Sequence, residues 1–341
     1  MGCAWLLKDV AEAEKLAAVE ALARELLRLA LNGQEGPCPA HPPGQPASPT
    51  TAGKEIAVFL TRLVRQFGKL KGFGFTGKFN GATGNLSAMV AAAPDVDWLS
   101  FTIDFVQSLG LEANPVTTQI EDHDRWCEYF DLVRRINNIV IDLNTDVWEY
   151  ISRGYLVQKP KQGEVGSSTM PHKVNPINFE NSEGNLALSN SLLHTLSDRL
   201  SGSRMQRDLS DSTVERNIGV ALAHSMLAMG ETVAGLKKVS LDPDACLTAI
   251  NTNPGLLAEP FQTILRTAGV ADAYDQLKSL TRGRQPTLAD FHALADSLSL
   301  PSHVRNRLRN LDAGSYLGDA VRLTEVGIAA ALIQLDPTED A

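Results

Sequence analysis

The chain has 341 residues, of which 43% are hydrophobic and 21% are charged, and its formal net charge is -9. This composition is typical of a globular protein large enough for two domains, and the acidic balance argues against general nucleic-acid binding, which needs a basic face. No run of about 18 apolar residues and no uncharged stretch after Met1 occurs, so we expect neither a membrane span nor a signal peptide.

The first third of the chain alternates between helical and irregular patterns. Apolar residues with 3-4-3 spacing predict a first helix: Val19, Leu22, Leu26 and Leu29. Residues 33–53 are dense in proline and glycine and predict a loop. A second helix is expected over 54–70. The five glycines of 71–85 predict another irregular connection, not a phosphate-binding loop, because no GK[ST] follows.

The remaining chain is also helical in pattern. A long helix is predicted over 120–153, and further helices over 178–198 and 211–237. Between them, residues 158–176 form a polar loop rich in glycine and serine. Prolines divide the last hundred residues into short helical segments. Long amphipathic helices often pair between subunits, so we expect an oligomer.

These patterns predict an all-α protein, a long-helix bundle followed by a smaller helical C-terminal domain. Residues 1–53 would form a partial helix and an irregular Pro/Gly-rich loop. Residues 54–240 would form the central bundle with the polar loop 163–176, and 241–341 the C-terminal domain. The four cysteines are scattered without a CxxC pair, which favours a reduced, cytoplasmic compartment over a zinc site or a disulfide framework.

The loop 163–176 reads GEVGSSTMPHKVNP and combines serines, glycines, a histidine and a lysine. Glycine lets the backbone take unusual angles, and a flexible, cation-bearing loop suits binding and gating. A solvated surface loop explains the same residues equally well. The loop alone therefore leaves both interpretations open.

Several motifs resemble one enzyme family. GSSTMPHKVNP is similar to the signature of the fumarase/aspartase superfamily, whose members eliminate fumarate. The segments INFENSEGN, RMQRDLSDSTVERN, TTQIEDHD, KFNGATGN and LAEPFQTILR resemble adenylosuccinate lyases of the bacterial type. The resemblance runs from about Gly44 to about Val326. It implies fumarate release from adenylosuccinate, giving AMP, and from the succinyl-carboxamide nucleotide of purine biosynthesis.

The resemblance also assigns roles to individual residues. Ser167 corresponds to the general base, and Glu180 to the glutamate that orients the catalytic histidine. The expected substrate-binding residues are Lys173, Asn175, Gln119, Asn181, Arg207, Ser212, Thr213 and Arg216. Arginine suits this role because its planar fork binds phosphate or carboxylate through two hydrogen bonds. The resemblance implies no metal or organic cofactor, and it implies a homotetramer whose sites each take residues from three subunits.

Ordinary structural interpretations stand beside these roles. Arg204, Arg207 and Arg216 could be surface charges, and Glu180 could simply be solvated. We interpret His172 as a loop residue that orients its neighbours. His123, His194 and His224 are expected to be structural or surface residues.

Two departures from the family pattern concern the first 43 residues. AHPPGQPASP stands where the family has a segment like SRTHGQPATP, which puts Pro43 at the position of the general-acid histidine. His41 lies two residues upstream and could replace it only if the loop shifts, which the adjacent prolines oppose. The family's N-terminal domain has no counterpart before the first helix. The alternative to an active lyase is therefore a catalytically impaired fragment or scaffold subunit of such a lyase.

Overall fold

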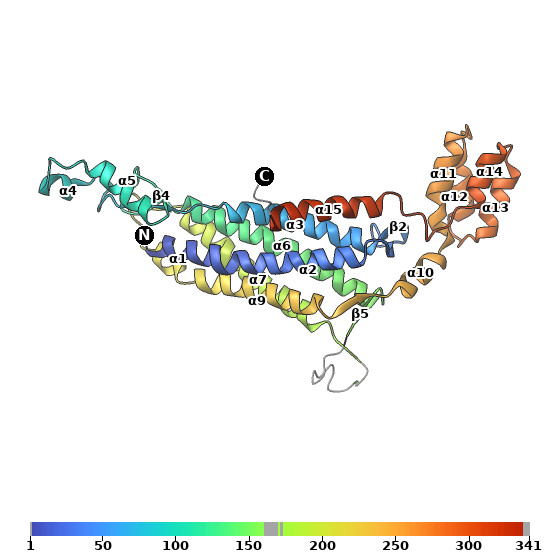
Figure 1. Ribbon diagram of the computed structural model, residues 1–341, viewed down its shortest axis with the longest axis horizontal. Helices are drawn as coiled ribbons and strands as arrows, with labels where there is room; N and C mark the ends of the chain where they lie inside the picture. The colour runs from blue at the N-terminus through green and yellow to red at the C-terminus, as the bar shows by residue number, and fades with distance from the viewer. Residues whose placement is uncertain (1, 160–169, 171–172, 337–341) are drawn as a thin grey trace.

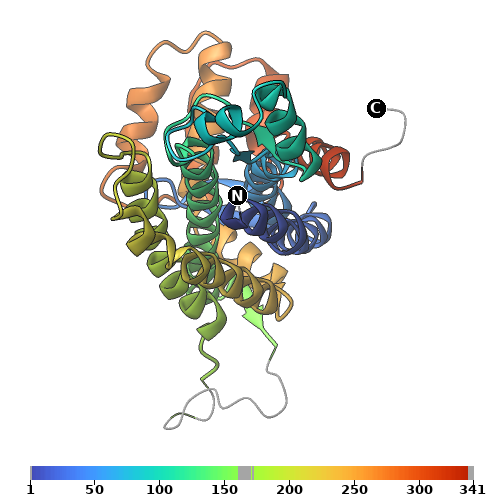
Figure 2. The same cartoon turned by 90° about the vertical axis from the view of Figure 1, so that its left-hand side faces the viewer.

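In the computed structural model, the chain is an elongated helical bundle with a small helical cluster at one end (Figure 1). The structure describes residues 2–159, 170 and 173–336. Within these residues, six long helices make up the bundle: α2 (Leu16–Asn32), α3 (Ala52–Lys71), α6 (Asp124–Ser152), α7 (Ile177–Leu200), α9 (Ile218–Leu236) and α15 (Ala320–Leu335). Figure 2 views the molecule from the end that holds α4 and α5. The prediction of an all-α fold is confirmed.

Shorter elements cap the two ends of the bundle. At one end lie α1 (Gly2–Asp9), a π-helix (Val10–Lys15), β3 (Thr76–Gly77), α4 (Ser87–Ala92), α5 (Trp98–Ser108), β4 (Glu112–Ala113) and α8 (Asp211–Glu215). At the other lie β1 (Pro37–Ala40), β2 (Ala47–Thr51), β5 (Leu156–Gln158), β6 (Val239–Leu241) and α10 (Pro243–Asn251). Beyond α10 come a 3-10 helix (Pro254–Leu257), α11 (Ala258–Thr267), α12 (Ala273–Thr281), α13 (Leu288–Ser297) and α14 (Ser302–Arg309).

Helix α6 is the longest element and forms because its apolar residues recur on one face. The predicted stripe is buried: Val133, Ile136, Val140, Leu143 and Val147 are each at most 1% exposed. Such a stripe stabilises a helix mainly by removing apolar surface from water. The helix begins after His123, whose backbone is left-handed, four residues later than the 120–153 prediction.

Two asparagines fix the register of α6 against its neighbours. Asn137 Nδ2 donates to Ser189 Oγ of α7 (3.1 Å), and Asn137 Oδ1 accepts from Ser225 of α9. Two turns further on, Asn144 Nδ2 donates to Ser182 Oγ (2.9 Å), while Asn144 Oδ1 accepts from Thr232. All six residues are fully buried. Sliding one helix would leave buried polar groups unpaired, at a cost of about 1–3 kcal/mol each.

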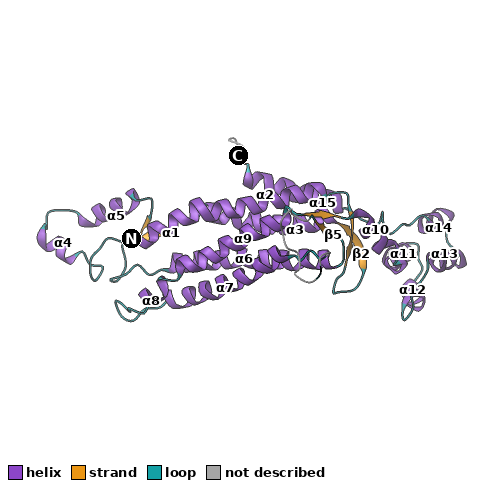
Figure 3. Ribbon diagram, turned by 90° about the horizontal axis from the view of Figure 1, so that it is seen from below, coloured by secondary structure: helices purple, strands orange, loops and turns teal. Residues whose placement is uncertain are grey.

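The strands were not predicted from the sequence. The expected loop 33–53 contains the antiparallel hairpin β1–β2, with Cys38 opposite Thr50, and β5 pairs with β6. Figure 3 shows β2 and β5 beside α10. Prolines at positions 37, 39 and 49 hid the hairpin from pattern analysis, since proline is tolerated only at strand edges. The predicted helix 211–237 is also interrupted, between Glu215 and Ile218.

The C-terminal segment contributes to two packing units. Residues between Ile250 and Ala313 form a separate apolar cluster centred on Phe261 and Phe291, whose rings are 4.9 Å apart. Helix α15 then returns to lie along α3 in the bundle. The domain boundaries at 53/54 and 240/241 stay a prediction.

One helical stretch, Asp211–Leu236, has the length and apolar composition of a membrane span. This is weak evidence, because buried helices of soluble proteins pass the same test.

Lys15 is a fully buried lysine at the end of the π-helix. Its ammonium nitrogen donates to Ser225 Oγ and lies 3.5 Å from Met229 Sδ, and no carboxylate bonds to it among the described residues. Burial lowers the pKa of Lys15 from 10.5 to about 7. Between those values the unfolded chain binds more protons than the folded chain. Stability should therefore rise with pH from about 7 to 10.5.

We predict that Lys15→Met stabilises the fold at pH 7 and flattens this pH dependence. The change keeps most of the side-chain volume and removes the titrating group. The wild-type slope would approach about 1.4 kcal/mol per pH unit within the window. Urea unfolding of both proteins between pH 7 and 10 measures this slope of the unfolding free energy. Parallel curves for the two proteins would contradict the assignment, and Lys71→Met, on the exposed end of α3, is the matched control.

Candidate active site

Two predicted binding residues meet at the start of α6. Gln119 and Arg207 line one hollow of about 440 Å³, together with Lys78, His123 and Trp126. We call this space the Gln119 hollow. Both side chains belong to exposed residues, one in the connection before α6 and the other in the connection after α7. Segments almost 90 residues apart in the sequence therefore form one polar surface, which holds an amide, two cations and the carboxylates of Glu121, Asp211 and Glu215.

Lys78 holds the Gln119 segment in place. Its ammonium donates to three carbonyl oxygens: those of Gly81 (3.2 Å), Thr118 (2.8 Å) and Gln119 itself (2.6 Å). These bonds use all three of its donors. Nearby, Asn80 Nδ2 donates to the Pro115 carbonyl (3.0 Å). Sequence analysis recognised KFNGATGN only as a family segment. The structure shows that this segment braces the backbone of Gln119.

The Arg207 segment is ordered by carboxylates. Arg207 lies 3.6 Å from Asp211, and Arg204 lies 3.4 Å from Asp208. Asp208 also accepts from Arg199 (2.6 Å). Hydrogen bonds from the backbone and side chain of Ser210, followed by that of Arg199, lower the pKa of Asp208 to about 2. These ionised partners keep the 199–211 connection folded.

Three other predicted residues follow on and after α8. Ser212 is half-buried, and its hydroxyl donates to the Leu209 carbonyl (2.8 Å). Thr213 and Arg216 are exposed. Of the four residues predicted in this stretch, Arg207 alone lines the Gln119 hollow.

His123 also lines the hollow, and the sequence left a structural and a surface interpretation open for it. It is only 5% exposed, so the surface interpretation is wrong. Its backbone φ is 66°, and its amide donates to Glu121 (2.9 Å). Nε2 lies 3.5 Å from Glu215 Oε1, whereas Nδ1 is buried without a hydrogen-bond partner among the described residues. No sequence pattern indicated this, because the geometry depends on a left-handed turn.

His41 and Glu180 lie at the opposite end of α6. The His41 ring stacks on Tyr155 with centroids 6.0 Å apart, and Glu180 accepts from Trp148 Nε1 (3.1 Å). Burial, and next the charge of Arg153, lower the pKa of His41. A lower pKa leaves less imidazolium at neutral pH, so less of His41 is in the form that can donate a proton. The Gly44 amide donates to the His41 carbonyl and closes the turn around Pro43.

The polar loop is described only in part. Ser167, the predicted base, and His172 lie outside the described residues. Lys173 is exposed, and its amide donates to the Met170 carbonyl (3.0 Å). Asn175 is half-buried. Asn181 is exposed on the first turns of α7, and its Oδ1 accepts from Asn185 (3.0 Å).

Within one chain, the residues of the Gln119 hollow do not meet His41 and Glu180. Trp126 lines the Gln119 hollow, and Trp148, which bonds Glu180, lies 22 residues further along uninterrupted α6. At 1.5 Å per residue this separates them by roughly 33 Å. A ligand the size of a nucleotide cannot touch both ends of one bundle.

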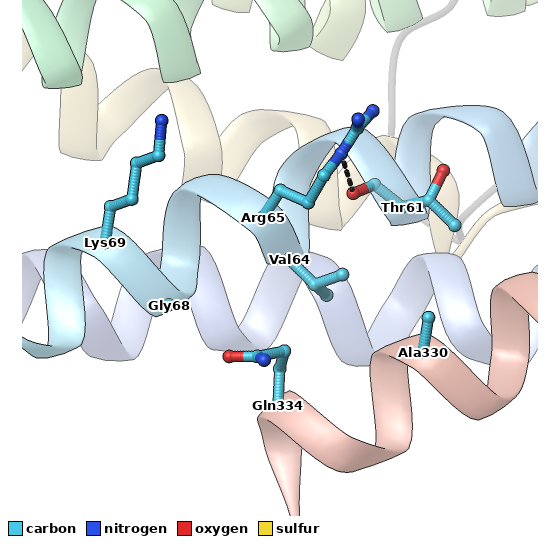
Figure 4. A pocket seen from close by; sticks show the side chains of 7 residues that line it. All are labelled: Thr61, Val64, Arg65, Gly68, Lys69, Ala330 and Gln334. Atoms are coloured by element: carbon cyan, nitrogen blue, oxygen red, sulfur yellow. Dashed lines mark hydrogen bonds between the residues drawn. The ribbon is translucent and has the colours of Figure 1, made fainter.

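A separate hollow of about 720 Å³ lies between α3 and α15 (Figure 4). Val64, Gly68 and Gln334 line it, and none of the predicted site residues does. A Cβ at Gly68 would lie 2.7 Å from Gln334 Oε1, so the end of the Gln334 side chain fills the space beside this glycine. We interpret the space as a packing groove.

Comparison with solved structures defines the class of fold. The chain is similar to a 3-carboxy-cis,cis-muconate lactonizing enzyme from Pseudomonas putida, with TM-score 0.79 and 22% identity over 98% of this chain and 75% of that one. A fumarate lyase from Mesorhizobium sp. BNC1 gives TM-score 0.77 and 16% identity over 95% and 74%. The family profile described as "Lyase" matches residues 4–188. The chain therefore has the lyase fold that these two structures share.

Sequence relatives narrow the family. The profile "Adenylosuccinate lyase C-terminal" matches residues 203–317. Adenylosuccinate lyases of Haemophilus influenzae and Escherichia coli are each 46% identical, over 88% and 87% of this chain and 66% and 65% of theirs. That of Vibrio cholerae is 42% identical over 94% and 71%. The chain belongs to the adenylosuccinate lyase family of the fumarase/aspartase superfamily. It spans about two thirds of the length of the curated relatives it matches.

We predict that Lys78→Met loosens the segment around Gln119. The substitution keeps the side-chain length and removes three charge-assisted hydrogen bonds, of about 1.5–3 kcal/mol each before solvent competition. Amide hydrogen exchange over residues 115–122 should become roughly tenfold faster or more. Exchange elsewhere in α6 and α7 should be unchanged.

Lys71→Met is the control for this experiment, since Lys71 is an exposed cation on α3. Unchanged exchange over 115–122 in Lys78→Met would contradict the bracing role. Equal acceleration in both variants would do the same.

Proposed function

We propose that this protein catalyses β-elimination of fumarate from adenylosuccinate, giving AMP, and from the succinyl-carboxamide nucleotide of purine biosynthesis. The observation that supports this most directly is the relationship to adenylosuccinate lyases, at 46% identity over 88% of the chain. The motif residues named from the sequence fall within the matched length. The Gln119 hollow places an amide and an arginine, which can bind phosphate or carboxylate, beside the carboxylates of Glu121, Asp211 and Glu215.

The proposed chemistry is acid–base catalysis with electrostatic stabilisation. Ser167 removes a proton from Cβ of the succinyl group, and the C–H electron pair becomes the new C=C bond. The C–N bond breaks, and its electron pair stays on the departing nitrogen, which takes up a proton. Lys173 and Asn175 stabilise the carboxylate on which charge builds before the bond breaks. A serine acts as a base only when cations and donors around it lower its pKa.

The remaining predicted residues bind the substrate in this proposal. Gln119 and Arg207 act from the Gln119 hollow, and Asn181 acts from the start of α7. Ser212, Thr213 and Arg216 extend the Arg207 surface toward the phosphate and succinyl groups. Glu180 orients the group that protonates the nitrogen.

The weak point of the proposed mechanism is the general acid. Proline at position 43 cannot transfer a proton, and it stands where the resemblance expects the histidine. His41 is the nearest imidazole, but its lowered pKa works against a donor role at neutral pH. We therefore expect proton transfer to limit turnover.

We further propose a cytoplasmic homotetramer with sites shared between subunits. Support comes from the separation of roughly 33 Å along α6, which one chain cannot bridge. Large apolar side chains are also exposed on the long helices, including Leu188 (55%), Leu227 (52%) and Val326 (62%). Apolar side chains repeated along unpaired helix faces favour association.

The direct test is fumarate release from adenylosuccinate by the purified chain, followed by absorbance. We expect release that Ser167→Ala abolishes, because the base is lost, without a change in sedimentation or circular dichroism. Release that persists in Ser167→Ala would contradict the base assignment. No release from a folded, oligomeric wild-type protein would contradict the proposed activity of this chain.

Restoring a histidine at position 43 tests whether the missing general acid limits turnover. Pro43→His should raise kcat, by roughly 10²–10⁴-fold if it regains the full contribution of a general acid. Pro43→Ala, which removes the proline without adding an imidazole, is the matched control. Equal rates in the two variants would show that proton donation at this position does not limit the reaction.

A further inference from the structure

Two buried cysteines meet where the hairpin β1–β2 packs against α10. Cys38 lies in β1 and is 2% exposed, and Cys246 lies in α10 and is 0% exposed. They belong to one small apolar cluster that also includes Tyr155. The Cys38 sulfur lies 3.7 Å from the Pro39 carbonyl oxygen, and Cys246 packs in the same cluster where β1 contacts α10. Both are free thiols in the structure.

We propose that Cys38 and Cys246 form a reversible oxidation site, in which a hydroperoxide converts the thiol pair to a disulfide that ties β1 to α10. Buried cysteines without a partner are usually inert. A thiol with a resolving cysteine beside it is the arrangement that hydroperoxides oxidise reversibly. The pair is 208 residues apart in sequence, so the bond would join the hairpin to the start of the C-terminal cluster.

The surroundings indicate which sulfur reacts first. Cys246 is the fourth residue of α10, whose N-terminal end favours negative charge. The hydrogen bond from Cys38 lowers the pKa of Cys246, although burial and then Asp242 oppose this. The same hydrogen bond, followed by burial, raises the pKa of Cys38. Because it lies in the first turn of α10, Cys246 is assigned as the attacking sulfur and Cys38 as the resolving one.

The reaction balances with the hydroperoxide as oxidant. The Cys246 thiolate attacks one peroxide oxygen, the O–O bond breaks, and hydroxide leaves with the Cys246 proton as water. The resulting sulfenic acid is attacked by the Cys38 sulfur. The S–S bond forms, the S–O bond breaks, and the hydroxide takes the Cys38 proton as a second water. Two thiols are oxidised and one hydrogen peroxide is reduced.

Access is provided by the hairpin. It is a two-stranded sheet, and such a pair is only marginally stable without its packing against α10. The turn residues 42–46 are exposed. Local opening of β1 would admit a molecule as small as hydrogen peroxide without unfolding the bundle.

Cys127 provides a matched internal control. It is also buried, its sulfur contacts the Ser197 carbonyl at 3.3 Å, and burial raises its pKa to about 11. No second cysteine shares its cluster among the described residues. Trypsin separates the three sites, since Cys38, Cys246 and Cys127 fall in peptides 29–54, 239–266 and 126–134.

The test treats the folded, reduced full chain with hydrogen peroxide, alkylates remaining thiols under denaturing conditions, and maps peptides by mass spectrometry. We expect peptide 29–54 linked to 239–266, reversed by dithiothreitol, with Cys127 still alkylated. The oxidised protein should melt several degrees higher. Cys38→Ser should stop the reaction at a Cys246 sulfenic acid that dimedone traps, and Cys127→Ser should leave the yield of the link unchanged.

Three results would overturn the proposal. One is the absence of the linked peptides from the folded protein after exposure to peroxide. Another is a link that forms only when urea has unfolded the chain. The third is oxidation of Cys127 at the same rate as Cys246. Each of these three results can be measured on the wild-type protein. The test therefore does not depend on whether a cysteine variant folds.

Discussion

The paired asparagines of α6 are the constraint from which the rest of the structure follows. Asn137 and Asn144 are seven residues apart, two helical turns, and each bonds side chains of both α7 and α9 inside the apolar core. A buried polar contact of this kind tolerates no slippage. It keeps three long helices in one register over their length. Their ends, and the site residues near them, are therefore held apart.

This separation explains why the candidate site residues fall into two groups, one at each end of α6. The Gln119 hollow lies at the start of α6, whereas His41 and Glu180 lie beside its end, at Tyr155 and Trp148. A straight bundle gains stability from long apolar faces, but it cannot fold back to close a site on itself. Neighbouring chains are the simplest source of the missing partners, which makes assembly part of the proposed function.

The helices could be predicted because each follows from apolar residues that recur with a helical period within a short stretch of sequence. The stripe from Val133 to Val147 is visible in the sequence and is buried as expected. The hairpin β1–β2 was missed, since its prolines suggest a loop and its pairing depends on packing under α10. Burial of Lys15 was also unforeseen, because one lysine in an Ala/Glu-rich helix reads as a solvated charge.

The site could be predicted only where family motifs name the residue. Gln119 and Arg207 were identified by resemblance, and the structure places both in one hollow. Lys78 was missed as a bracing residue because it acts on backbone carbonyls, which no side-chain pattern reveals. For His123 the sequence left a structural and a surface interpretation open, because its burial depends on a left-handed backbone turn.

The central claim is that the separated halves of the site meet between chains, and sedimentation equilibrium of the purified protein tests it most directly. A measured mass about four times that of one chain, held across micromolar concentrations, is the result we predict. A mass of one chain over the same range would contradict the claim, because the two groups of residues could then never meet.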